Sequence, residues 1–207
     1  MKSEFIEADI WQGIISGMTP ANARAIAVAL ETGMRIGDVL RLEVSNLLDS
    51  GISYTAQKTG KTGFATCSAK TLQLLRDNAD KTGVCFPSRF GSKGKYRSRQ
   101  AVWKDVKRAV NNSGLKAHVS PHSARKTFAV DLRRREGVGA VQKALQHRYG
   151  TTTNEYAFAD LQGMDYGRER IVNEAVEKVL ERLGDMLGID LSEKTPKPLD
   201  FYGEDDL

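Results

Sequence analysis

Cysteine and histidine are scarce in this sequence, and their spacing argues against two common classes of site. Of the 207 residues, two are cysteine and three are histidine; Cys67 and Cys85 form no Cys-x-x-Cys pair, and no histidine lies close to either. A disulfide scaffold or a zinc ribbon does not fit this pattern. We therefore expect both cysteines to be ordinary buried or half-buried thiols.

Long apolar runs are lacking as well. No stretch approaches the roughly 20 apolar residues that a membrane span requires. The first residues carry Glu4, Glu7 and Asp9, where a signal peptide would need a basic start and an apolar stretch. The sequence thus predicts a cytoplasmic protein that does not enter a membrane. With 40% hydrophobic residues it can bury one core, and we expect one domain over residues 1–190 and an acidic, flexible tail over 191–207.

Acidic residues are almost missing from the middle of the chain. Between Lys81 and Lys126 there are twelve lysines or arginines, and Asp105 is the one acid. From Asn154 to Leu207 the balance reverses, with six basic and fourteen acidic residues. A basic middle and an acidic end favour a surface that binds a polyanion, although charge alone fits a solvated face equally well.

The hydrophobic spacing predicts a mainly helical α+β fold. Two short apolar runs, Ile52–Gln57 and Phe64–Cys67, flank a turn over 58–63 and should pair as a small antiparallel hairpin or sheet. Thr19 is expected to cap the second helix and Gly33 to end it. Helical periodicity predicts helices over Phe5–Gly17, Ala21–Glu31, Arg35–Leu42, Ser68–Asp80, Arg97–Asn112, Pro121–Glu136, Gly139–Gln146 and Tyr166–Leu187.

Two local patterns imitate phosphate and metal sites. A Gly-Lys-Thr run at 60–62 resembles the end of a nucleotide-binding loop, but that motif needs a glycine where Thr55 stands. His118 and His122 have the helical spacing of two metal ligands, but Pro121 between them favours the start of a helix there. We predict neither a metal nor a cofactor.

Four separated segments carry side chains suited to displacement at a phosphodiester. Each side chain alone has an ordinary explanation: Arg35 could pair with Asp38 on a helix surface, and a histidine could simply be buried in the core. The candidate residues, in chain order, are Arg35, Lys58, His122, Arg125, His147 and Tyr156.

Together these residues resemble the motifs of the tyrosine recombinase and phage integrase family. The run Thr32-Gly-Met-Arg-Ile-Gly-Asp38 is similar to the family's first box, and His122-Ser-Ala-Arg125 to its His-x-x-Arg box. The family's second histidine and its nucleophile fall on His147 and Tyr156, nine residues apart. The resemblance covers about residues 5–160.

Two positions within the resemblance are less regular. The family's hairpin lysine falls on Lys58, which directly follows the predicted strand, although Lys61 could take its place. Gln146 stands where the family usually has glycine before the histidine. The local turn at Gln146 is thus in more doubt than the chemistry.

The resemblance implies the catalytic domain of an enzyme that cuts and rejoins double-stranded DNA through a 3′-phosphotyrosine at Tyr156. Planar guanidinium groups such as Arg35 and Arg125 suit the oxygens of a pentavalent phosphate. Lys58 is a reasonable general acid for the departing 5′ oxygen. His122 would accept the tyrosine proton or support the phosphate, and His147 would donate a further hydrogen bond.

The resemblance also implies partners. A homo-oligomer, a tetramer on paired DNA sites that could be a monomer in solution, is expected, in a bacterial or phage-encoded protein associated with the nucleoid. The helix over 166–187 would dock on a neighbouring protomer or on its own core. Further DNA contacts are expected from Lys61, Lys93, Lys95, Arg97, Arg99 and Lys126.

Two alternatives remain open on the sequence. The same residue types serve a type IB topoisomerase, which nicks and recloses one strand, and the fold could carry a non-catalytic DNA-binding regulator. The family's usual N-terminal DNA-binding domain is missing before Arg35, so this is either a short recombinase or one domain of a longer protein. Binding alone does not require a tyrosine at position 156, which favours the enzyme.

Overall fold

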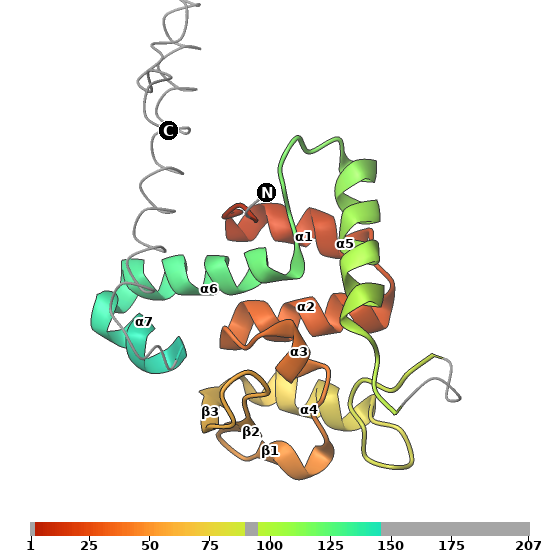
Figure 1. Ribbon diagram of the computed structural model, residues 1–207, viewed down its shortest axis with the longest axis vertical. Coiled ribbons are helices and arrows are strands. Elements are labelled where there is room, and N and C mark those ends of the chain that lie inside the picture. Colours follow the sequence, from red (N-terminus) through yellow and green to blue (C-terminus); the bar gives the residue numbers. More distant parts are fainter. Residues whose placement is uncertain (1–2, 90–94, 146–207) are drawn as a thin grey trace, which may run out of the picture. The chain divides into compact units, whose positions relative to one another are not determined.

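The computed structural model describes residues 3–89 and 95–145. Helices dominate, and a small antiparallel sheet follows the third of them (Figure 1). The elements in chain order are α1 (Ala8–Ser16), α2 (Pro20–Thr32), α3 (Ile36–Val39), the 3₁₀ turn η1 (Val44–Asn46), β1 (Leu47–Leu48), β2 (Gly51–Thr55), β3 (Thr62–Thr66), α4 (Ala69–Asp77), α5 (Arg99–Ser113), α6 (Pro121–Glu136) and α7 (Val138–Leu145). The predicted mainly helical α+β fold is confirmed.

The helical part is built around α2, which packs against α1, α5 and α6 (Figure 1). Ala25, Ile26 and Ala29 of α2 have no exposed surface, and Ala124 of α6 has none either. Small side chains let helix backbones approach closely, which suits the extensive packing of α2 against α6. The longest helix in the described ranges, α6, has 16 residues, and no helix there has both the length and the apolarity to cross a membrane.

The sheet has the order β1-β2-β3, with both neighbours antiparallel. Tyr54 of β2 pairs with Gly63 of β3, and Leu47 of β1 with Ile52 of β2. The predicted hairpin is therefore confirmed, but its turn lies two residues earlier, over 56–61, because β2 ends at Thr55 and β3 begins at Thr62. Lys58 thus lies within the turn and does not directly follow the strand. The sequence did not predict β1, since two residues are too short to show an alternating pattern.

The third helix is shorter than predicted. It ends at Val39 rather than at Leu42, because the next backbone N–H groups bond three residues back: that of Arg41 to Asp38 and that of Leu42 to Val39. The Leu42 carbonyl then accepts from the Cys85 N–H at 3.0 Å. The tightened last turn directs the chain away from the helix axis toward the segment around Cys85.

Both cysteines are free thiols that are at least partly buried. Cys85 is buried and Cys67 is half-buried. Burial raises the pKa of each thiol to about 11, and neighbouring carboxylates, Glu31 for Cys67 and Glu43 for Cys85, act in the same direction. Neither thiol is therefore activated as a nucleophile at neutral pH, as expected from the sequence.

Candidate active site

Arg125 is the most deeply buried of the four candidate residues that the structure describes. It lies on α6 with a side chain that is 3% exposed. Its Nη1 donates to the Gly33 carbonyl at 2.5 Å and its Nη2 to the Leu145 carbonyl at 3.1 Å. The guanidinium thus joins the end of α2, two residues before Arg35, to the end of α7, two residues before His147.

Gly33 makes this contact possible. It ends α2 in the left-handed conformation with φ of 67°. A Cβ at this position would overlap the ring of Phe128 and come within 2.9 Å of Leu145 Cδ2. A glycine is therefore required both by the backbone and by the close packing of α6 and α7.

His122 lies one turn before Arg125, at the start of α6. Ser120 and Ser123 form a reciprocal cap: Ser120 Oγ accepts from the His122 N–H at 3.2 Å, and Ser123 Oγ accepts from the Ser120 N–H at 3.2 Å. Pro121 is the first helical residue, so His118 lies outside the helix. The His122 side chain is exposed, whereas that of Arg125, one turn later on α6, is buried.

Arg35 precedes α3, and Asp38 lies within it. Arg35 is half-buried, whereas Asp38 is 5% exposed. Among the described residues no ion pair joins them; instead, Asp38 Oδ1 accepts from the backbone N–H of Gln57 at 2.9 Å. The interpretation of Arg35 and Asp38 as a surface pair is therefore wrong, and Asp38 connects α3 to the hairpin.

Lys58 is exposed on the turn between β2 and β3. The preceding Gln57 ties this turn to α3 twice, through its N–H to Asp38 and through its Nε2 to the Gly37 carbonyl at 2.5 Å. Lys61 is exposed on the same turn, and its carbonyl accepts from the Ala56 N–H at 2.9 Å. Both candidate lysines thus stand on one anchored turn.

Tyr54 of β2 is influenced by the charges of both candidate arginines. Burial raises the pKa of this half-buried phenol, and the Asp38 carboxylate raises it further, while the charges of Arg125 and Arg35 oppose the rise. The Tyr54 hydroxyl is therefore within the electrostatic range of both arginines and of Asp38. The sequence interpretation missed Tyr54 and Gln57, for which no motif exists; Asp38 was visible in the first box but was given no role.

A basic hollow of about 470 Å³ adjoins these residues. Its lining includes three of the predicted DNA contacts, Lys95, Arg97 and Arg99. Of the other predicted contacts, Lys126 donates to the Ser3 carbonyl at 2.5 Å and is partly buried. Lys93, His147, Tyr156 and the helix predicted over 166–187 lie outside the described residues.

Comparison with known proteins places the chain in a family. Residues 11–162 match the model of the phage integrase family. The chain belongs to this family.

Two curated relatives are similar to this chain over part of their length. The chain is 29% identical over 138 residues to tyrosine recombinase XerC of Xylella fastidiosa (strain M23); the alignment covers 63% of this chain and 46% of that protein. It is 31% identical over 134 residues to XerD of Staphylococcus aureus (strain Mu50 / ATCC 700699), covering 60% and 45%. The chain spans about half the length of the curated relatives it matches.

Solved structures of phage integrases and related recombinases have the same fold. A lambda integrase dimer bound to a COC′ core site matches with a TM-score of 0.64 at 19% identity, over 75% of this chain and 48% of that one. XerA recombinase gives 0.63 at 23% identity, over 82% and 66%. The catalytic domain of bacteriophage HP1 integrase gives 0.58 at 18% identity and is covered to 95%. These likenesses confirm the tyrosine recombinase catalytic-domain fold.

Within this integrase fold, four of the six candidate residues lie in the described part of the chain. Arg125 bonds to the Gly33 carbonyl, two residues before Arg35. Asp38, three residues after Arg35, accepts from the N–H of Gln57, which directly precedes Lys58. His122 lies one turn before Arg125. The guanidinium groups of Arg35 and Arg125 can bind the oxygens of a phosphate. The exposed Lys58, on a turn bonded to α3, can protonate a leaving oxygen.

Proposed function

We propose that this integrase-family chain is the catalytic part of a site-specific recombinase, which cuts and rejoins double-stranded DNA through a 3′-phosphotyrosine. The observation that carries the proposal is the fixed guanidinium of Arg125, bonded to the carbonyls of Gly33 and Leu145. These carbonyls adjoin the segments of Arg35 and His147. The relatives named tyrosine recombinase XerC and XerD support strand exchange rather than nicking and reclosing.

In the proposed reaction the Tyr156 oxygen attacks the phosphorus and the 5′ oxygen of the next nucleotide leaves. Arg35 and Arg125 neutralise the charge that grows on the non-bridging oxygens, where planar guanidinium donors are most effective. Lys58 gives its proton to the leaving 5′ oxygen. The bond energy stays in the phosphotyrosine, so a second 5′ hydroxyl can attack the phosphorus and release Tyr156.

The two histidines complete the proposed machinery. A tyrosine with an ordinary pKa near 10 needs a base or nearby positive charge to become nucleophilic at neutral pH. His122, exposed at the start of α6, is assigned to accept the proton or to support the phosphate. His147 is assigned as a further hydrogen-bond donor to the phosphate.

The proposal includes assembly on DNA. Structural neighbours of low identity include a lambda integrase tetramer bound to a Holliday junction and XerH bound to difH substrate. By analogy we assign residues 1–190 to a catalytic domain that forms a homo-tetramer on paired sites, with 191–207 as a tail. The helix predicted over 166–187 is the candidate contact between protomers.

The decisive experiment traps the covalent intermediate. Nicked suicide duplexes, from which the short fragment with the freed 5′ hydroxyl diffuses away after cleavage, are incubated with the native chain, with Tyr156→Phe and with Tyr202→Phe as the matched control. A DNA adduct seen in denaturing gels with the native and Tyr202→Phe proteins and absent from Tyr156→Phe supports the assignment. An adduct that persists in Tyr156→Phe places the nucleophile elsewhere, and supercoil relaxation without strand exchange would favour a topoisomerase.

A further inference from the structure

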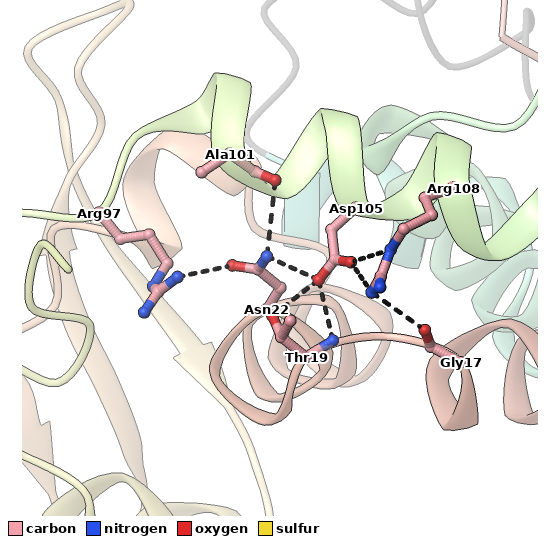
Figure 2. A network of polar contacts seen from close by, with 7 residues as sticks. All are labelled: Gly17, Thr19, Asn22, Arg97, Ala101, Asp105 and Arg108. Carbon is pink, nitrogen blue, oxygen red and sulfur yellow. Dashed lines mark hydrogen bonds and ion pairs between the residues drawn. The ribbon is translucent and has the colours of Figure 1, made fainter.

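Asp105, the single acid between Lys81 and Lys126, is the centre of a buried polar network (Figure 2). Its side chain is 7% exposed. Its Oδ2 accepts from the Thr19 N–H at 2.9 Å, the Thr19 hydroxyl at 2.7 Å and Asn22 Nδ2 at 2.7 Å, and its Oδ1 accepts from Arg108. Burial would raise the pKa of this carboxyl, but these hydrogen bonds outweigh burial and hold the pKa below its usual value. Asp105 is therefore an ionised acceptor at neutral pH.

The Thr19 hydroxyl bonds to Asp105 instead of capping α2. The residue occupies the N-cap position of α2, as predicted, yet its side chain makes no capping hydrogen bond. Its hydroxyl and its N–H both donate to Asp105 instead. The start of α2 is thereby fixed to α5.

Asn22 connects Asp105 to Arg97 through hydrogen bonds at both ends of its amide. Its side chain is 4% exposed. Because an ionised carboxylate only accepts, the amide must turn its NH₂ toward Asp105 and its oxygen away. That oxygen accepts from Arg97 Nη1 at 3.2 Å, as Figure 2 shows. The Asp105 carboxylate on α5 thus fixes the orientation of the Asn22 amide on α2, and this amide in turn fixes the position of the Arg97 guanidinium.

Arg97 is held at the wall of the basic hollow. Four of the nine lining residues are cationic and none is acidic; Lys95 is paired with Glu43, which lies outside the lining. Among the described residues the Arg97 guanidinium makes one hydrogen bond, to Asn22, and its Nε is buried without a partner. Burial lowers the pKa of Arg97, and the charges of Arg24 and Arg89 lower it further, while the Asp105 carboxylate opposes the shift without reversing it.

The hollow also adjoins the candidate active site. Gly37 and Gln57 belong to its lining. Gly37 lies between Arg35 and Asp38, and Gln57 directly precedes Lys58. A phosphate held in the hollow would therefore belong to the same DNA segment as the phosphate that is cut.

We propose that Arg97 binds a backbone phosphate of DNA in this hollow and that Asn22 and Asp105 are positioning residues that hold its guanidinium for this contact. The inference rests on the proposed function, because it takes DNA as the substrate. A preorganised guanidinium loses little freedom on binding, so this contact contributes more than a mobile surface lysine does.

A double-mutant cycle tests the network. Because phosphate contacts are independent of sequence, a fluorescent duplex of mixed sequence serves as probe, and Kd is measured over a series of salt concentrations. Arg97→Ala should raise Kd roughly tenfold, as expected for a charge-assisted hydrogen bond, and flatten the salt slope by about 0.9. Asn22→Ala should raise Kd several-fold in the native background and leave it unchanged in the Arg97→Ala background.

The matched control is Lys104→Ala, which removes an exposed charge from α5, the helix that follows Arg97, at a position outside the hollow. It should change Kd by less than about twofold. The inference is overturned if Arg97→Ala behaves like this control, or if Asn22→Ala weakens binding equally in both backgrounds, since that is the result of a merely structural role. Thermal unfolding of each variant checks that it is folded.

Two further outcomes separate this inference from the proposed function. Native protein that shows this binding pattern but forms no Tyr156 adduct refutes the recombinase chemistry and keeps the phosphate contact, whereas no binding to any duplex overturns both. A last experiment uses inorganic phosphate as the ligand in place of DNA. If it stabilises the native protein against heat more than Arg97→Ala, at matched ionic strength, while DNA affinity is equal in the two, the hollow is a site for a free anion and the DNA assignment fails.

Discussion

The two best-described parts of the candidate active site are held in opposite ways. Arg125 is buried on a helix, and its guanidinium is fixed by two backbone carbonyls. Lys58 is exposed on a turn, and the turn is tied to the rest of the fold through Gln57 alone among the side-chain contacts of the described residues. The first region is part of the packed core; the second is attached to it.

This difference fits the two tasks. Stabilising a charged transition state depends on donors that are already in place, because reorganising them during the reaction costs free energy. Delivering a proton requires a group that can approach the leaving oxygen and withdraw. We therefore expect changes around Arg125 to lower the stability of the fold and changes at Lys58 to lower activity alone.

The largest expected effect is at Lys58. Lys58→Ala should slow cleavage by about 10² to 10⁴, the usual contribution of a general acid, while the free energy of unfolding changes by less than about 0.5 kcal/mol, because the side chain is exposed. Single-turnover cleavage and denaturant unfolding measure the two quantities. A substrate with sulfur in place of the leaving 5′ oxygen should restore the rate, since a thiolate leaves without a proton.

Lys61→Ala is the matched control on the same turn. It should cut the normal substrate at close to the native rate and gain nothing from the sulfur substrate. If the two variants exchange these behaviours, Lys61 is the general acid, and if neither is rescued by sulfur, the proton comes from elsewhere.

The next effect is on stability and belongs to the Arg125 region. Gly33→Ala adds a side chain where φ is 67° and where a Cβ would overlap Phe128. Left-handed backbone strain of about 1–2 kcal/mol and overpacking of about 1–3 kcal/mol should together lower the free energy of unfolding by about 2–5 kcal/mol.

Gly60→Ala provides the comparison in the lysine turn. Gly60 has the same φ of 67°, but nothing lies within 4 Å of its added Cβ. Only the backbone strain of about 1–2 kcal/mol should remain. Denaturant unfolding measures the free energy of unfolding of both variants. Equal decreases for Gly33→Ala and Gly60→Ala would contradict the view that the Arg125 region is packed more tightly than the lysine turn.

The sequence predicted most of this fold for identifiable reasons. The boundaries of α6 follow from Ser120, Pro121 and Gly137, and the hairpin from two apolar runs around a glycine-rich turn. The first box and the His-x-x-Arg box pointed to the residues that the structure brings to one region. Local propensities and short motifs are sufficient for such features.

The contacts between residues far apart in the chain could not be predicted from the sequence. Nothing in the chain shows that Asp38 bonds to the N–H of Gln57 or that Asn22 stands between Asp105 and Arg97, because those partners are 19, 83 and 75 residues apart. A usable signal existed only for Asp105, the lone acid of a basic segment, since a conspicuous charge exception often marks a buried pair.

The smallest effect concerns Asp38, which connects the two regions. Asp38→Ala removes the acceptor for the Gln57 N–H, so the turn of Lys58 is less well placed; Asp38→Asn keeps an oxygen at that point. We expect Asp38→Ala to slow cleavage by about tenfold, near the 1–2 kcal/mol of a lost hydrogen bond, and Asp38→Asn to retain most of the rate. Because Asp38 acts through Lys58, adding Asp38→Ala to Lys58→Ala should slow cleavage no further. Additive losses in single-turnover cleavage would mean that Asp38 acts on the arginines instead, and that the turn is placed by the bond from Gln57 to Gly37 alone.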